Sequence, residues 1–169
     1  RSKALGSGVE FSDFREYAHG DDLRRVDWNA FARFDRLFLK LFMEEQEQRI
    51  HLVLDMSASM GFGEPSKGDC GVMLLETLCY LALRGADTVT LYALTGDGER
   101  HTPPLSGRYS YPRAAAFLAD LRPQGQTALN RELPRLPLNP GRGVTVLVSD
   151  LLSQDGYERG VQSLAFRKQ

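Results

Sequence analysis

The 169-residue chain has few cysteines and no long apolar run, and both features limit what kind of protein it can be. Its two cysteines, Cys70 and Cys79, lie nine positions apart in a segment that we expect to form one helix. Nine positions are about two and a half helical turns, so the thiols face opposite sides and a disulfide between them is implausible. No apolar stretch approaches the roughly 20 residues that span a bilayer, and no basic-then-apolar leader is present. We therefore expect a cytoplasmic protein with no membrane segment in this chain; since it begins at Arg1 rather than Met, an anchor further upstream is compatible with the sequence.

Charge and motif content disfavour several further functions. The formal net charge is −1, so no overall positive field attracts nucleic acid, and we expect no nucleic-acid partner. The three histidines, His19, His51 and His101, show no metal-ligand spacing. The sequence contains neither a glycine-rich loop ending in GK[ST] nor a serine–histidine arrangement beside a glycine elbow.

Apolar segments alternate with amphipathic ones along most of the chain, which is typical of an α/β fold. A composition of 42% hydrophobic and 25% charged residues is sufficient for a folded core. Residues 9–36 fit neither the helical nor the strand period, so we expect turns and one short helix near 27–33. We predict an irregular N-terminal extension over residues 1–36 and a domain with a mostly parallel central sheet over residues 37–169. Strands are expected at 37–43, 49–54, 88–94, 100–102 and 143–149, and helices at 67–84, 111–121, 128–136 and 155–166.

Polar side chains follow two of the predicted parallel strands. The stretch LVLDMSASMGFGE ends an apolar strand in Asp55 and then offers two hydroxyls, Ser57 and Ser59. Asp150 follows the apolar strand 143–149, and Thr127 lies in the loop GQT. Parallel sheets bind ligands beyond the carboxyl ends of their strands, so we expect these five side chains to meet at one rim. Because hydroxyls outnumber carboxylates, Mg²⁺ is favoured over Ca²⁺, with Mn²⁺ as a further alternative.

Two alternatives account for the same residues. Serine and aspartate are common helix caps, so the loop after Asp55 could be a cap and a turn without any metal. Asp55 could also be the nucleophile of a Mg²⁺-dependent phosphoryl hydrolase, since such enzymes use an aspartate at a strand end. Phosphoryl transfer needs cationic groups around the developing charge, and the nearest basic residue after Asp55 is Lys67. We therefore favour a non-enzymatic binding module over an enzyme.

The motif DMSASM, together with Thr127 and the strand-end Asp150, resembles the metal-ion-dependent adhesion site of von Willebrand factor A-like domains. The resemblance extends from about residue 49 to the end of the chain and implies a three-layer, Rossmann-like domain. It further implies that Ser57, Ser59 and Thr127 ligate Mg²⁺ directly, while Asp55 and Asp150 act mainly through water. We then expect a carboxylate of a partner protein to take the open coordination position.

The residues before the predicted sheet point to one particular family. GVEFSDFREYAHGDDLRRVDW, followed by AR at positions 32–33, looks like the bacterial domain of unknown function number 58, in which this signature precedes a von Willebrand factor A-like domain. Members are typically encoded beside MoxR-type AAA+ ATPases, which implies such an ATPase and an unknown client protein as partners in protein assembly or activation. The family's sheet continues after the final helix, whereas this sequence stops at Gln169, so we expect the last strand to be missing. The signature positions are Arg15, Gly20, Asp21, Asp22, Arg24, Asp27, Trp28 and Arg33.

The charged residues of this block have two interpretations. Arginine forks could hold carboxylates in a structural network, with Trp28 as a core plug, and this is the interpretation we favour. Exposed aromatic residues such as Phe11, Phe14 and Tyr17 would instead indicate a partner surface, since aromatic and arginine side chains dominate interface hot spots.

Overall fold

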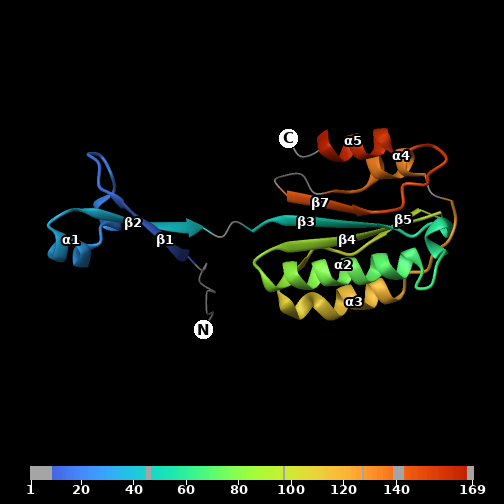
Figure 1. The fold of residues 1–169 in the computed structure, drawn as a ribbon, viewed down its shortest axis with the longest axis horizontal. Coiled ribbons are helices and arrows are strands. Elements are labelled where there is room, and N and C mark those ends of the chain that lie inside the picture. The colour runs from blue at the N-terminus through green and yellow to red at the C-terminus, as the bar shows by residue number, and fades with distance from the viewer. Residues whose placement is uncertain (1–8, 45–46, 97, 127, 139–142, 167–169) are drawn as a thin grey trace. The chain divides into compact units, whose positions relative to one another are not determined.

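The computed structural model describes residues 9–44, 47–96, 98–126, 128–138 and 143–166. The chain divides into two compact units, Arg1–Gln46 and Glu47–Gln169 (Figure 1). The boundary lies ten residues later than the one we expected after residue 36. The reason is that the predicted strand 37–43 forms in the first unit, where it pairs with a strand near the N-terminus.

In the first unit, two antiparallel strands are joined by a connection that contains a short helix. β1 (Val9–Glu16) pairs with β2 (Phe38–Glu44), with an irregularity in register between Phe11 and Asp13. The connection contains the 3-10 turn η1 (Leu23–Arg25) and α1 (Trp28–Phe34), which confirms the short helix predicted near 27–33. The prediction of turns for residues 9–16 was wrong, because the hydrogen bonds of β1 come from a partner strand more than 20 positions away.

The second unit is a mixed α/β domain built on one central sheet, as predicted. The sheet order is β5-β4-β3-β7, with the short β6 also paired to β4. β3 is parallel to both β4 and β7, whereas β5 and β6 run antiparallel to β4. The strands are β3 (Arg49–Asp55), β4 (Thr88–Thr95), β5 (Gly98–His101), β6 (Leu105–Ser106) and β7 (Gly143–Val148).

Helices cover both faces of this sheet (Figure 1). α2 (Lys67–Arg84) and α3 (Tyr111–Ala119) lie on one face, and α4 (Leu129–Glu132) and α5 (Glu158–Phe166) lie on the other. The alternation of side chains along β3 supplies both cores: Leu52 and Leu54 join the cluster on the α2 side, and Val53 joins the cluster on the α5 side. β3 is therefore buried from His51 onward and apolar from Leu52 to Leu54, and its last residue, Asp55, is buried at the end of that run.

Local chemistry sets the start and end of the helix nearest to the rim. α2 begins with a capping box, in which Ser66 Oγ accepts from the Asp69 amide while the Asp69 carboxylate accepts from the Ser66 amide. It ends at Arg84, with Gly85 as its C-cap, at the bounds predicted from its periodicity. Gly71 lets this helix approach β3 closely, because a Cβ there would lie 2.6 Å from Leu54 Cδ1.

The third predicted helix is shorter than expected. The segment predicted over 128–136 is divided into α4 and the 3-10 turn η4 (Leu133–Arg135). Pro134 has no amide hydrogen to donate, so the α-helical pattern does not continue through it. The last helix starts at Glu158 rather than 155, after Gly156 adopts a positive φ of 76°.

Candidate metal-binding rim

The carboxyl ends of the neighbouring strands β3 and β7 bring two acidic segments together. Leu54 is in register with Val148, so Asp55 and Ser149 follow on adjacent strands. Ser149 Oγ donates to Asp55 Oδ2 at 2.6 Å, although the two residues are 94 positions apart. Ser149 was not among the residues predicted from the sequence, because nothing in the motif indicates which neighbour the second carboxylate oxygen of Asp55 will find.

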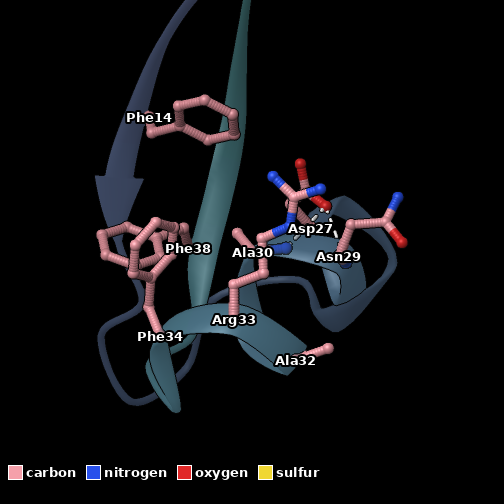
Figure 2. A pocket seen from close by; sticks show the side chains of 8 residues that line it. All are labelled: Phe14, Asp27, Asn29, Ala30, Ala32, Arg33, Phe34 and Phe38. Carbon is pink, nitrogen blue, oxygen red and sulfur yellow. Dashed lines mark hydrogen bonds between the residues drawn. The ribbon is translucent and has the colours of Figure 1, made fainter.

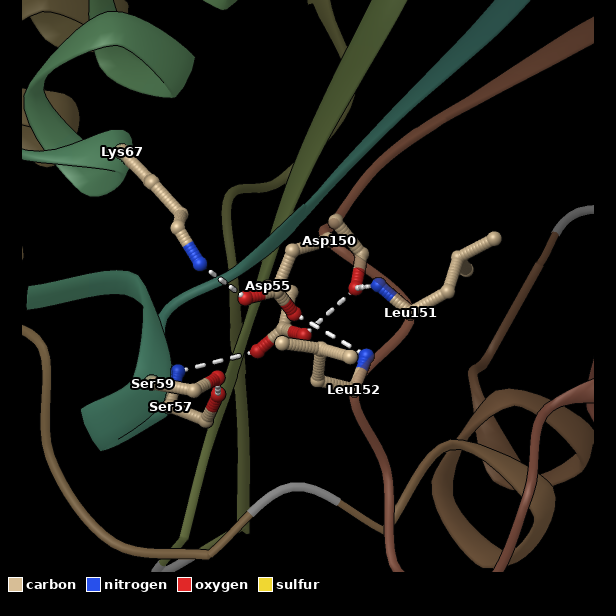
Figure 3. Close-up of polar contacts among 8 residues, drawn as sticks. Asp55, Ser57, Ser59, Lys67, Asp150, Leu151 and Leu152 are labelled. Carbon is tan, nitrogen blue, oxygen red and sulfur yellow. Dashed lines mark hydrogen bonds and ion pairs between the residues drawn. The ribbon is translucent and has the colours of Figure 1, made fainter. Parts of the chain in front are cut away.

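The loop after β3 folds back onto the carboxylate that precedes it. Asp55 is fully buried, and its Oδ1 accepts from the Ser57 amide at 2.9 Å (Figure 3). The hydroxyls of Ser57 and Ser59 lie 3.0 Å apart, with Ser57 buried and Ser59 half-buried. Three of the predicted ligands, Asp55, Ser57 and Ser59, are thus gathered within one short loop, with two hydroxyl oxygens side by side.

A second loop is attached to this one through its backbone. The Ala58 amide donates to the Gly125 carbonyl at 2.9 Å, and the Gln124 amide donates to the Met56 carbonyl at 2.9 Å. Gly125 approaches Gly96 so closely that a Cβ on Gly96 would lie 2.3 Å from Gly125 Cα. These contacts hold residues 124–126 beside the serine loop. The predicted ligand Thr127 lies outside the described residues.

Asp150, the predicted ligand after β7, forms an ion pair with Lys67. The Lys67 ammonium donates to Asp150 Oδ2 at 2.7 Å, and the Leu152 amide donates to Asp150 Oδ1 at 3.0 Å (Figure 3). Desolvation raises the pKa of the Asp150 carboxyl, but the bonds from Lys67 and from the Leu152 amide outweigh it and hold that pKa below its ordinary value. The sequence identified Lys67 only as the nearest basic residue; that it reaches Asp150, 83 positions away, follows from the fold.

A further buried acid lies on the α5 side of the sheet. Glu132, at the end of α4, is buried, and desolvation raises the pKa of its carboxyl. The nearby charge of Asp55 acts in the same direction, although Arg131 opposes it. No sequence pattern marked this residue, since its burial results from the packing of α4 against the sheet.

The hydroxyl and carboxylate oxygens of the rim are of the ligand types that a hard cation prefers. Among the residues that the structure describes, no cluster of three or more histidine, cysteine, aspartate or glutamate side chains is found. The rim instead offers the hydroxyls of Ser57 and Ser59 with the carboxylates of Asp55 and Asp150. Mg²⁺ accepts such a mixture because it retains several waters and uses few protein carboxylates. The residues present therefore fit a divalent cation in donor chemistry.

In the first unit, several signature residues form the structural network that we favoured. Arg15 pairs with Asp21 at 2.9 Å, and the salt bridge and the Ala18 amide lower the pKa of the Asp21 carboxyl. Asp27 caps α1 through the amides of residues 29 and 30 and pairs with Lys40 at 3.2 Å. Two further signature positions shape or cap the turn before α1: Gly20 has a φ of 105°, and Asp22 accepts from the amide of Arg24.

The aromatic residues of the same unit differ from our prediction of a structural network around a buried Trp28. Trp28 is 60% exposed, so the prediction that it is a core plug was wrong; it lies at the first position of α1, where the unit offers little core to receive it. Arg33 borders a surface hollow together with Phe14, Phe34 and Phe38 (Figure 2). Phe14 is exposed and Tyr17 is half-buried, while the side chain of Phe11 is outside the described part. The unit therefore combines a charged structural network with an exposed aromatic surface.

No helix in the described part of the chain is long and apolar enough to cross a bilayer.

Solved structures share the fold at low sequence identity. An aerotolerance-related membrane protein from Bacteroides fragilis, crystallised with multiple mutations to serines, is 21% identical and has a TM-score of 0.52, over 72% of this chain and 64% of that one. BatB from Bacteroides thetaiotaomicron, a conserved hypothetical protein, is 20% identical with a TM-score of 0.50, over 71% of this chain and 60% of that one. At such identities the similarity establishes a shared mixed α/β fold.

Sequence relatives are found in mycobacteria. The uncharacterized proteins Mb1516 of Mycobacterium bovis and Rv1480 of Mycobacterium tuberculosis are each 28% identical over 170 aligned residues, which cover 96% of this chain. The alignment covers 53% of each relative, so the chain spans about half the length of the curated relatives it matches. The family described as "Protein of unknown function DUF58" matches residues 13–169, and the chain belongs to this family.

Proposed function

We propose that this chain is a non-enzymatic, metal-dependent protein-binding module whose second unit is von Willebrand factor A-like. The observation that carries the proposal is the meeting of Asp55, Ser57, Ser59 and Asp150 at the carboxyl ends of the adjacent parallel strands β3 and β7. Three separate stretches of chain, counting residues 124–126, contribute to this rim. A helix cap and turn would need only the serine loop, and Ser57 makes no side-chain capping bond to the turn that follows it.

In this proposal the two serines and Thr127 ligate Mg²⁺ directly, with Mn²⁺ and Ca²⁺ as alternative ions. Asp55 and Asp150 orient the water that surrounds the ion and balance its charge. Asp55 suits such an indirect role, since one of its oxygens is taken by the Ser57 amide and the other by Ser149 Oγ. The bound cation supplies a Lewis-acid position that a carboxylate of the partner can occupy.

A Mg²⁺-dependent phosphoryl hydrolase that uses Asp55 as a nucleophile is less well supported. Asp55 has no exposed surface, and its two carboxylate oxygens are bonded to groups of the chain itself. A nucleophile must present a free oxygen to the phosphorus atom. A phosphatase assay with Mg²⁺ and generic phosphate esters should therefore show no turnover above background.

The proposed partners are a MoxR-type AAA+ ATPase and a client protein that the two act on together in assembly or activation. An ATPase partner requires ATP, so we propose that the encounter takes place on the cytoplasmic side. The exposed aromatic surface of the first unit, with Trp28 and Phe34, is a second area through which such a partner could be contacted, since aromatic residues contribute strongly to interfaces.

Surface plasmon resonance tests the proposal directly. The chain is immobilised, and the MoxR-type ATPase of the same organism is passed over it in Mg²⁺ or in excess EDTA. We expect binding in Mg²⁺ that is lost in EDTA and lost in Ser57→Ala and Ser59→Ala. Ser110→Ala, which removes an exposed hydroxyl bonded to the Ser106 carbonyl, is the control and should bind like the unmodified chain. Equal binding with and without the chelator would refute the metal-dependent mode of binding.

A further inference from the structure

Lys67 stands out among the residues of the rim because it is a cation in a site whose chemistry suits another cation. Its ammonium lies 2.7 Å from Asp150 Oδ2, and the pair is partly enclosed, with 43% of the Lys67 side chain and 13% of the Asp150 side chain exposed. The stem of Lys67 also borders an apolar groove that includes Phe62, Leu74 and Val148. The ammonium is therefore directed toward the rim by its contact with Asp150.

The position of Lys67 on its helix makes this arrangement unusual. It is the first residue of the 18-residue helix α2, where the positive end of the helix dipole favours anions and disfavours cations. The adjacent capping box already places Asp69 in the first turn, and this carboxylate is bonded to Ser66. The compensating partner of the Lys67 ammonium is thus Asp150, at the end of a strand in another part of the unit.

We propose that Lys67 is a built-in counter-cation that holds Asp150 when no metal is bound and competes with the divalent ion for this carboxylate. The inference rests on the proposed metal site and adds a residue that sets its affinity. A divalent ion near the serine hydroxyls would repel the ammonium, and Asp150 cannot serve both cations fully. Metal binding therefore displaces Lys67, whose flexible side chain can turn toward solvent.

This competition predicts that removing the ammonium strengthens metal binding. Lys67→Met keeps most of the apolar stem but leaves Asp150 free for the ion. An ammonium that lies 2.7 Å from a carboxylate which the ion also uses, in a partly hydrated site, competes strongly enough to change affinity by roughly tenfold. We therefore expect Mg²⁺ to bind roughly tenfold more tightly to Lys67→Met, and Lys67→Arg, which keeps the charge, to bind like the unmodified chain.

Lys40 provides a closely matched control. It also pairs with a partly enclosed aspartate, Asp27, at 3.2 Å, with 39% of the lysine and 11% of the aspartate side chain exposed. Lys40 belongs to the first unit, whereas the rim residues belong to the second. Lys40→Met removes a similar ion pair that does not include a predicted metal ligand, and it should leave the Mg²⁺ affinity unchanged.

The experiment is isothermal titration of the 169-residue chain and its variants with MgCl₂, with bound Mn²⁺ counted by electron paramagnetic resonance. Circular dichroism confirms that each variant is folded. The inference is supported if Mg²⁺ binds more tightly to Lys67→Met than to the unmodified chain, Lys67→Arg and Lys40→Met. If Mg²⁺ binds to Lys67→Met and does not bind to the unmodified chain, the inference is also supported, but a metal-dependent function of the natural sequence is refuted. Equal affinities of the unmodified chain and Lys67→Met refute the inference and leave the proposed function standing. Absence of binding to both refutes the two together.

Discussion

Ser149→Ala should destabilise the second unit, because Ser149 donates to a carboxylate that is completely buried. Its hydroxyl lies 2.6 Å from Asp55 Oδ2, and Asp55 has no exposed surface from which water could replace the bond. A hydrogen bond to a charged group contributes about 1.5–3 kcal/mol, and a buried acceptor that loses its donor bears the desolvation cost as well. Ser149 is half-buried, so water can partly enter the vacated space. We therefore expect the free energy of unfolding to fall by about 2 kcal/mol.

The second bond of the same hydroxyl adds little to this effect. Ser149 Oγ also accepts from the Leu151 amide at 2.9 Å, but Leu151 is exposed, and water can replace that acceptor. The loss is thus assigned to the Asp55 bond. Since domains are stable by only about 5–15 kcal/mol, a change of this size is readily measured.

Urea unfolding followed by far-UV circular dichroism is the appropriate assay. The single tryptophan, Trp28, belongs to the first unit, so its fluorescence monitors that unit separately and should show the same midpoint in the variant. Ser110→Ala removes an exposed hydroxyl bonded to a backbone carbonyl and serves as the control, with an expected change below about 0.5 kcal/mol. If Ser149→Ala changed stability no more than this control, the reasoning about the buried carboxylate would be refuted.

Three further predictions concern other parts of the second unit. Gly160→Ala should lower the free energy of unfolding by about 2 kcal/mol, because the new Cβ would lie 2.5 Å from the Leu129 carbonyl oxygen. Urea unfolding measures this change. The control is Gln162→Ala on the exposed side of α5, which should change stability little. With a thiol reagent, Cys70 should react in the folded protein and Cys79 only after denaturation. Cys79 is buried, and desolvation raises the pKa of its thiol to about 11. Rapid reaction of both thiols in the folded protein would contradict the packing of α2. Desolvation raises the pKa of Glu132 in the folded state, so the folded protein holds this proton more tightly and loses stability as pH rises from the ordinary value of the carboxyl through its raised value. Urea midpoints measured between pH 4 and 7 should therefore fall less steeply with pH in Glu132→Gln, and parallel curves for the two proteins would contradict the burial of this acid.

The sequence by itself determined the elements whose causes are local. α2 was predicted at its observed bounds because its apolar spacing lies within the helix and Gly85 follows it directly. β3 and β7 were recognisable as apolar runs, since parallel strands covered on both faces need apolar residues at nearly every position. Asp55, Ser57 and Ser59 were found together for the same reason: they belong to one continuous motif.

Only the tertiary structure decided the features that depend on distant partners. β1 was missed because its ladder is formed with β2, and the boundary between the units moved for the same reason. Trp28 was expected inside because tryptophan is apolar, yet the small first unit leaves it largely in solvent. Ser149 and Lys67 entered the rim only when strand register and helix packing brought them to Asp55 and Asp150. A local pattern states which groups a segment can offer, whereas the distance between charges far apart in the chain is set by the packing of the whole unit.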